Sequence, residues 1–162
     1  MLLYLFGSKD GLVRALLVRA RSDELDLLNN LRRRSEDSYP PGLVDLGAGV
    51  WEWLAAEDHR GLLTLWVEAY ARSLVDPDGP WADFARTTVH DWLAVLADAQ
   101  PAAQRDTQSG LAERTLVLAV LRGALLDLLA TGDHDRATSA VHQQLRHLTN
   151  STPLPADDDH NS

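Results

Sequence analysis

The sequence predicts an all-α fold, and three observations support this fold class. Apolar residues recur at three- and four-residue spacing in every regular stretch, which is the period of a helix with one buried face. Clusters rich in proline, glycine and aspartate separate these stretches, as in "SEDSYPPG" (35–42) and "DPDGP" (76–80). No stretch alternates apolar and polar residues in the way that a half-buried strand does.

The first expected helix begins at Ser8 and ends near residue 34. Ser8 is a good N-cap, and Asp10 places a carboxylate in the first turn, where backbone N–H groups lack partners. One apolar stripe follows, made of Leu12, Val13, Leu16, Leu17, Ala20, Leu25, Leu28 and Leu31. The prolines and glycine that follow end this helix.

Three further helices are expected over residues 43–57, 61–74 and 81–96. Gly47 and Gly49 lie inside the first of them and each costs up to ~1 kcal/mol relative to alanine, so either that helix is weak or a neighbour packs closely there. The side chains predicted to face inward are Leu46, Val50, Trp51 and Leu54; Leu62, Leu63, Trp66, Val67, Ala69, Tyr70 and Leu74; and Trp81, Phe84, Ala85, Thr88, Val89, Trp92, Val95 and Leu96.

A polar loop, "QPAAQRDTQSG" (100–110), is expected before the last two helices. The helix over 111–131 is apolar around most of its circumference and ends at Gly132, a C′ glycine. The final helix is capped by Asp133 or Asp135, and we expect its inward residues to be Ala137, Ala140, Val141, Leu145 and Leu148. Residues 151–162 offer little to bury and are expected to be disordered.

Composition and charge restrict the partners of this chain. The net charge is −9, but residues 1–34 hold seven Lys and Arg against four Asp and Glu, whereas the remainder holds eight against twenty. An acidic body does not bind a polyanion, so nucleic acid is expected to meet only the N-terminal end. The run Arg32 to Arg34 is expected to be a solvated helix end. With no cysteine, no membrane-length apolar run and no leader pattern, a cytoplasmic location without membrane contact is expected.

The motifs of catalysis are absent from the sequence. There is no Glu-x-x-His pair, no His-Glu-x-x-His, no glycine-rich phosphate loop and no nucleophile elbow. His59 and His90 are expected to be capping or surface residues. We therefore expect neither enzymatic activity nor a metal or cofactor.

The aromatic residues of the middle helices allow two interpretations. They fill a core, as aromatic residues at helical spacing usually do, or they line a pocket for an apolar small molecule. The candidates for such a pocket are Trp51, Trp66, Tyr70, Phe84, Thr88 and Trp92.

The last two helices also allow two interpretations. A helix that is apolar on nearly all sides must be covered on nearly all sides, by a second copy of the chain or by its own fold. Ala119, Gly123 and Ala124 would allow a close approach. The candidates for a homodimer interface are Leu118, Leu121, Arg122, Leu125, Val141 and Leu145.

The opening stretch "LLYLFGSKDGLVRALL" (2–17) resembles the end of the helix-turn-helix in TetR/AcrR-family transcriptional regulators. The matching residues are Phe6, Gly7, Ser8, Lys9, Asp10 and Leu12. Two later stretches are also similar to members of this family: "LLTLWVEAYARSLVDPDG" (62–79) to a middle helix, and "LVLAVLRGALLDLLATGDHDRA" (116–137) to the dimerisation helices.

The resemblance implies three parts: the end of a helix-turn-helix with a connecting helix (1–34), a ligand-binding and dimerisation bundle (35–150) and an acidic tail (151–162). It places Tyr4 and Lys9 at DNA phosphates, with Lys9 in the position of a phosphate-contacting lysine. It also implies a helical regulatory bundle, a homodimer and an apolar effector.

Residues 1–34 match only the end of a helix-turn-helix, and most of that motif is missing from the sequence. We therefore expect Met1 to be an internal methionine of a longer product, or the chain to be a natural truncation. Double-stranded DNA is expected to bind only when the missing helices are present. The alternative is a stand-alone helical dimerisation module that does not bind DNA.

Overall fold

The computed structural model describes residues 11, 12, 15, 18, 42–79 and 81–151, and every regular element in this part of the chain is helical. The prediction of an all-α class is confirmed for these residues. The expected helix over 8–34, the residues matching the helix-turn-helix and residues 152–162 of the tail lie outside them, apart from four positions of the first helix; Ser151, predicted to begin the tail, is the last residue of the final helix.

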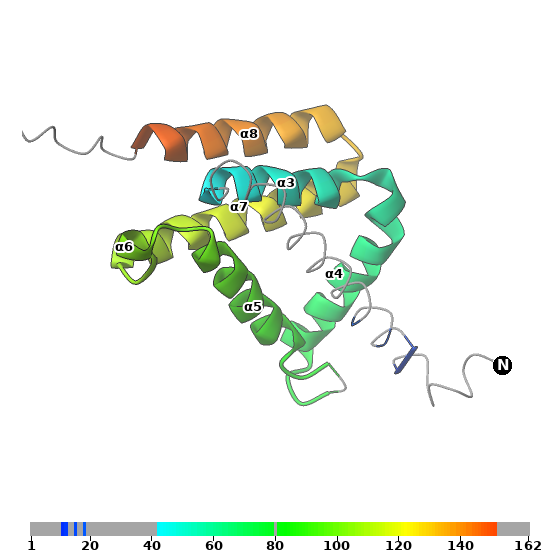
Figure 1. Cartoon of the computed structure of the whole chain (residues 1–162). Helices are drawn as coiled ribbons and strands as arrows, with labels where there is room; N and C mark the ends of the chain where they lie inside the picture. The colour runs from blue at the N-terminus through cyan, green and yellow to red at the C-terminus, as the bar shows by residue number, and fades with distance from the viewer. Residues whose placement is uncertain (1–10, 13–14, 16–17, 19–41, 80, 152–162) are drawn as a thin grey trace, which may run out of the picture.

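The helices form two groups (Figure 1). Helices α3 (Leu43–Ala55), α7 (Gln108–Thr131) and α8 (His134–Ser151) run side by side across the upper part of the view. Helices α4 (Arg60–Val75) and α5 (Phe84–Asp98) descend from them and converge at the turn below. A single turn of 3-10 helix, η1 (Glu57–His59), leads into α4, and a short helix, α6 (Ala102–Arg105), leads into α7.

The main core lies where α3, α7 and α8 meet. The four residues predicted to face inward on α3, Leu46, Val50, Trp51 and Leu54, are all buried. Trp51 is 1% exposed, and its indole Nε1 donates a hydrogen bond to Thr138 Oγ1 on α8 at 3.0 Å. Because a buried indole N–H needs an acceptor, this bond allows the largest side chain of the core to be fully covered.

Gly47 lies at the closest approach of α3 to its neighbours. A Cβ atom added there would lie 3.1 Å from Leu145 Cδ2 and 3.2 Å from Val117 Cγ1. Both neighbours are buried and belong to different helices, α8 and α7. The close packing that a glycine inside a helix predicted is therefore present at Gly47.

Gly47→Ala is expected to destabilise the fold by about 1–2 kcal/mol, since overpacking a full core costs about 1–3 kcal/mol and the gain in helix propensity is at most about 1 kcal/mol. Gly61→Ala is the matched control, because a Cβ at Gly61 meets nothing within 4 Å. The control should be neutral or slightly stabilising. Urea unfolding followed by far-UV circular dichroism measures both, and a stabilised Gly47→Ala variant would contradict this account.

The segment expected to be a polar loop is partly helical. It contains α6, and α7 begins at Gln108, three residues earlier than predicted. Thr107 caps α7, since its Oγ1 accepts a hydrogen bond from Gly110 N at 3.0 Å. Gln100, which is 3% exposed, donates to the Gly110 carbonyl at 2.9 Å and accepts from Arg114 Nη1 at 2.9 Å. The polar residues of this segment thus make caps and buried hydrogen bonds.

Two residues predicted to face inward are exposed. Leu74 is 66% exposed, because the last turn of α4 turns its neighbour Ser73 toward α5, where Ser73 Oγ accepts a bond from Ala85 N at 3.1 Å. Ala140 is exposed because α8 buries Ala137, Val141 and Leu145, and a neighbouring residue lies about 100° away around the helix.

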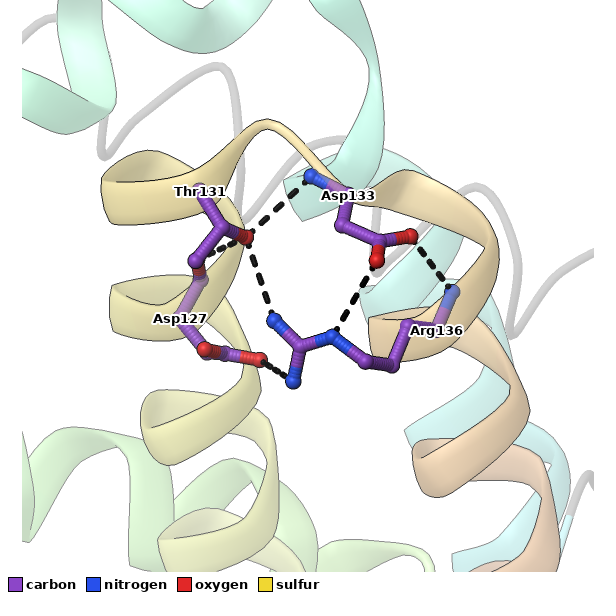
Figure 2. A network of polar contacts seen from close by, with 4 residues as sticks. All are labelled: Asp127, Thr131, Asp133 and Arg136. Carbon is purple, nitrogen blue, oxygen red and sulfur yellow. Dashed lines mark hydrogen bonds and ion pairs between the residues drawn. The ribbon is translucent and has the colours of Figure 1, made fainter.

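The turn between α7 and α8 is held by polar contacts (Figure 2). Gly132 has φ 71° and ends α7, as predicted. Asp133 caps α8 by accepting the Arg136 backbone N–H at 3.1 Å. The Arg136 guanidinium reaches Asp127 on α7 at 2.7 Å, Asp133 at 3.2 Å and Thr131 Oγ1 at 3.2 Å. The hydrogen bond to Asp127, followed by the charge of that carboxylate, raises the pKa of Arg136.

Candidate functional site

The six residues predicted to line a pocket do not lie together. Trp51 belongs to the main core, since its ring is covered and its nitrogen is bound to α8. Phe84 packs edge to face on Trp81, with ring centroids 5.6 Å apart, in a smaller cluster near the start of α5. Trp92 is partly buried against the main core. Trp51 is therefore assigned to the core rather than to a pocket.

Trp66 and Tyr70 are neighbours on α4, and Tyr70 contacts an arginine of α7. Their ring centroids are 5.0 Å apart, with the ring planes tilted by 33°. Tyr70 Oη accepts a hydrogen bond from Arg122 Nη1 at 2.8 Å, across 52 positions of sequence. Tyr70, which was predicted to line the pocket, thus contacts Arg122, which was predicted to lie at the dimer interface.

Thr88 is a buried residue of α5, the helix that packs against α4. The bond between Ser73 Oγ and Ala85 N fixes the register of α4 and α5, which run in opposite directions from their shared turn. Tyr70 precedes Ser73 by three residues on α4, and Thr88 follows Ala85 by three residues on α5. Each is therefore displaced by about 4.5 Å along its helix axis from the Ser73–Ala85 bond. Thr88 is 2% exposed, and its Oγ1 has no hydrogen-bond partner in the described part of the chain.

We call Trp66, Tyr70, Thr88 and Arg122 the aromatic–arginine site. Arg122 is half-buried, and besides the bond to Tyr70 its Nε donates to the Leu118 carbonyl at 3.4 Å. Three of the five guanidinium N–H groups are left. Within residues 42–79 and 81–151 no carboxylate forms an ion pair with Arg122. The site therefore combines ring surface, a cation and a buried hydroxyl.

The aliphatic residues predicted for a dimer interface lie inside the chain's own core. Leu118, Leu121, Leu125, Val141 and Leu145 are at most 3% exposed. Their burial within one chain is the second interpretation of the apolar helix, and it accounts for these five side chains. A second copy cannot contact them without unfolding the core.

The outer face of α7 nevertheless carries an apolar seam. Its members alternate at four- and three-residue spacing and are all exposed: Ala112, Leu116, Ala119, Gly123, Leu126 and Ala130. Leu116 is 41% exposed and Leu126 is 50% exposed. A Cβ added at Gly123 would meet nothing within 4 Å, so the monomer itself does not require glycine there. We refer to these six residues as the α7 seam.

A cavity of about 220 Å³ lies beside the turn between α7 and α8. The sequence did not indicate this cavity. Its lining comes from α3, η1, α4, α7 and the start of α8: Leu54, Ala55, Ala56, Glu57, Arg60, Leu128, Leu129, Gly132 and His134. The residues come from five segments with no shared motif, so no sequence pattern could have brought them together.

His59 is placed by contacts within the chain. Its ring stacks on Trp53 with centroids 4.2 Å apart, and its Nδ1 lies 2.7 Å from the Trp53 carbonyl oxygen. The residue closes the turn between α3 and α4. In the described ranges no group of three or more His, Cys, Asp or Glu side chains could hold a metal ion.

Tyr4 and Lys9, the predicted contacts to DNA phosphates, lie outside the described residues. Comparisons with protein families, with curated proteins and with solved structures find no match for this chain. Among the residues that the structure describes, none of the helices has the length and apolar character needed to cross a membrane.

Proposed function

We propose that this chain is the effector-binding and dimerisation part of a TetR-type transcriptional regulator. The likeness of residues 2–17 to the end of a helix-turn-helix suggests the family, and the observation that carries the proposal is the α7 seam. A regulator that reads DNA with two heads needs a self-complementary surface that pairs its subunits.

The α7 seam has the spacing of a coiled-coil interface. Residues at alternating steps of four and three face one side of a helix, the pattern that two packed helices share. Small residues at its centre, Ala119 and Gly123, let two helix backbones approach closely, while Leu116 and Leu126 gain burial on either side. A second copy of α7, related by a two-fold axis, is the occupant that matches this pattern.

The effector binds at the aromatic–arginine site in this proposal. The contact between Tyr70 and Arg122 joins α4 to α7, and α7 also carries the seam, so a ligand there contacts the helix that sets the subunit pairing. Ligand binding favours one of two subunit arrangements and thereby shifts the spacing of the DNA-reading heads. DNA binding belongs to the protein with a complete helix-turn-helix, where Tyr4 and Lys9 face the phosphates.

Chromatin immunoprecipitation of the tagged protein from its own cells tests the regulatory function. We expect enrichment of a small set of DNA segments over an untagged control, reduced when the effector is present. Sedimentation velocity of the purified chain tests the dimer separately. A dimer without any DNA enrichment would favour the stand-alone dimerisation module, and a monomer at all concentrations would overturn the pairing on which the proposal depends.

A further inference from the structure

The effector site contains a cation whose hydrogen-bonding capacity is only partly used. Arg122 is half-buried, yet among the described residues its partners are a tyrosine hydroxyl and a backbone carbonyl, both neutral. A guanidinium removed from water is stabilised by a carboxylate or another anion, and leaving it without one carries a desolvation penalty. The neutral partners do not supply this compensation.

Tyr70 on α4 and Thr88 on α5 each carry a hydroxyl group that can donate a hydrogen bond. Tyr70 Oη accepts from Arg122, so its own hydrogen is directed away from the guanidinium and can be donated elsewhere. Thr88 Oγ1, which is buried, makes no hydrogen bond within the described part of the chain. Buried hydroxyls normally have a partner, so the missing one is best supplied from outside the chain. Arg122 and Tyr70 are in contact between α7 and α4, and Thr88 is an unpartnered hydroxyl on α5, the helix that packs against both.

From this set of donors we propose that the effector is an amphipathic carboxylate. Its carboxylate binds Arg122, Tyr70 and Thr88, and its apolar body packs on the ring of Trp66. Planar guanidinium N–H groups match the two oxygens of a carboxylate, which explains an arginine at this position rather than a lysine. The inference rests on the proposed effector binding and narrows the effector from any apolar molecule to an acid.

Calorimetric titration of the 162-residue chain with matched pairs of ligands tests the inference. The probes are biphenyl-carboxylate with its carboxamide and octanoate with octanamide, so that each pair differs in charge and hardly in size. We expect at least one acid to bind about tenfold or more tightly than its amide. In Arg122→Gln this ratio should fall to about one, while in Arg60→Gln, an exposed arginine at the start of α4, it should not change.

Further variants keep the test decisive if Arg122→Gln fails to fold. Arg122→Lys retains the charge and should retain a preference for the acid with weaker affinity, and Tyr70→Phe should weaken the acid more than the amide. Equal binding of acid and amide would overturn the acidic effector but leave the effector site in place. No binding by any probe at about 1 mM, where even weak sites fill, would overturn both the inference and the proposed effector site.

Discussion

Leu121→Asp is expected to unfold the chain. Leu121 is 1% exposed in the main core, so aspartate there removes a packed side chain and buries a carboxylate among apolar side chains. Removal of a buried leucine side chain alone costs about 2–5 kcal/mol, and an unpaired buried charge adds several more. The total exceeds about 5 kcal/mol, which is comparable to the whole stability of an ordinary domain.

Guanidinium unfolding followed by tryptophan fluorescence and far-UV circular dichroism measures this effect. Leu74→Asp is the matched control, because Leu74 is 66% exposed near the end of α4 and the same substitution there should cost less than about 1 kcal/mol. A Leu121→Asp chain that unfolds cooperatively near the wild-type midpoint would show that α7 is not the centre of the core. The same result would mean that the opposite face of α7 is the buried one.

The buried faces of most helices could be predicted because their sequences are apolar on one side. On α3 the period of the apolar residues identified all four buried large side chains. The predictions that Leu74 and Ala140 face inward were wrong for one reason. Both lie at the edge of an apolar stripe, where a rotation of about 100° separates the core from solvent, and the position of the neighbouring helix determines which residue is covered. The spacing of residues along one helix gives no information on where the neighbouring helix lies.

The orientation of α7 could not be predicted from its own residues. Its sequence is apolar on nearly every side, so Leu121 is a predicted interface residue and Leu126 is not, although of these two only Leu126 is exposed. About 200° of rotation separates Leu121 from Gly123, and packing against α3 and α8 selects which side is inside. The sequence shows that this helix is apolar around its circumference, whereas the choice of its outward residues needs the fold.

The aromatic–arginine site was predictable only in part. Trp66, Tyr70 and Thr88 were candidates because they are aromatic or polar at inward positions. Arg122 was placed at a subunit interface instead, since no sequence pattern connects it with a tyrosine 52 positions earlier. Burial of a single threonine hydroxyl without a partner is likewise a property of the packed helices and leaves no trace in the spacing of residues.

Leu126→Asp is expected to dissociate the proposed dimer without unfolding the chain. Residues of a two-fold interface face the same surface of the other copy, so each carboxylate replaces a buried apolar contact and meets a second carboxylate nearby. We expect the dissociation constant to rise by at least about 100-fold, or roughly 3 kcal/mol, in sedimentation velocity across a concentration series. The helical content should match that of the wild type, because Leu126 is 50% exposed in the single chain.

Leu74→Asp and Gly123→Trp make the result specific to the α7 seam. Leu74→Asp introduces the same charge near the end of another helix, on an exposed leucine outside the seam, and should leave the dimer unchanged. Gly123→Trp adds bulk without charge where the single chain has open space, and should separate the two backbones and weaken the dimer. If Leu74→Asp dissociates the dimer while Leu126→Asp and Gly123→Trp do not, the subunits pair through the end of α4, and the seam on α7 has another role.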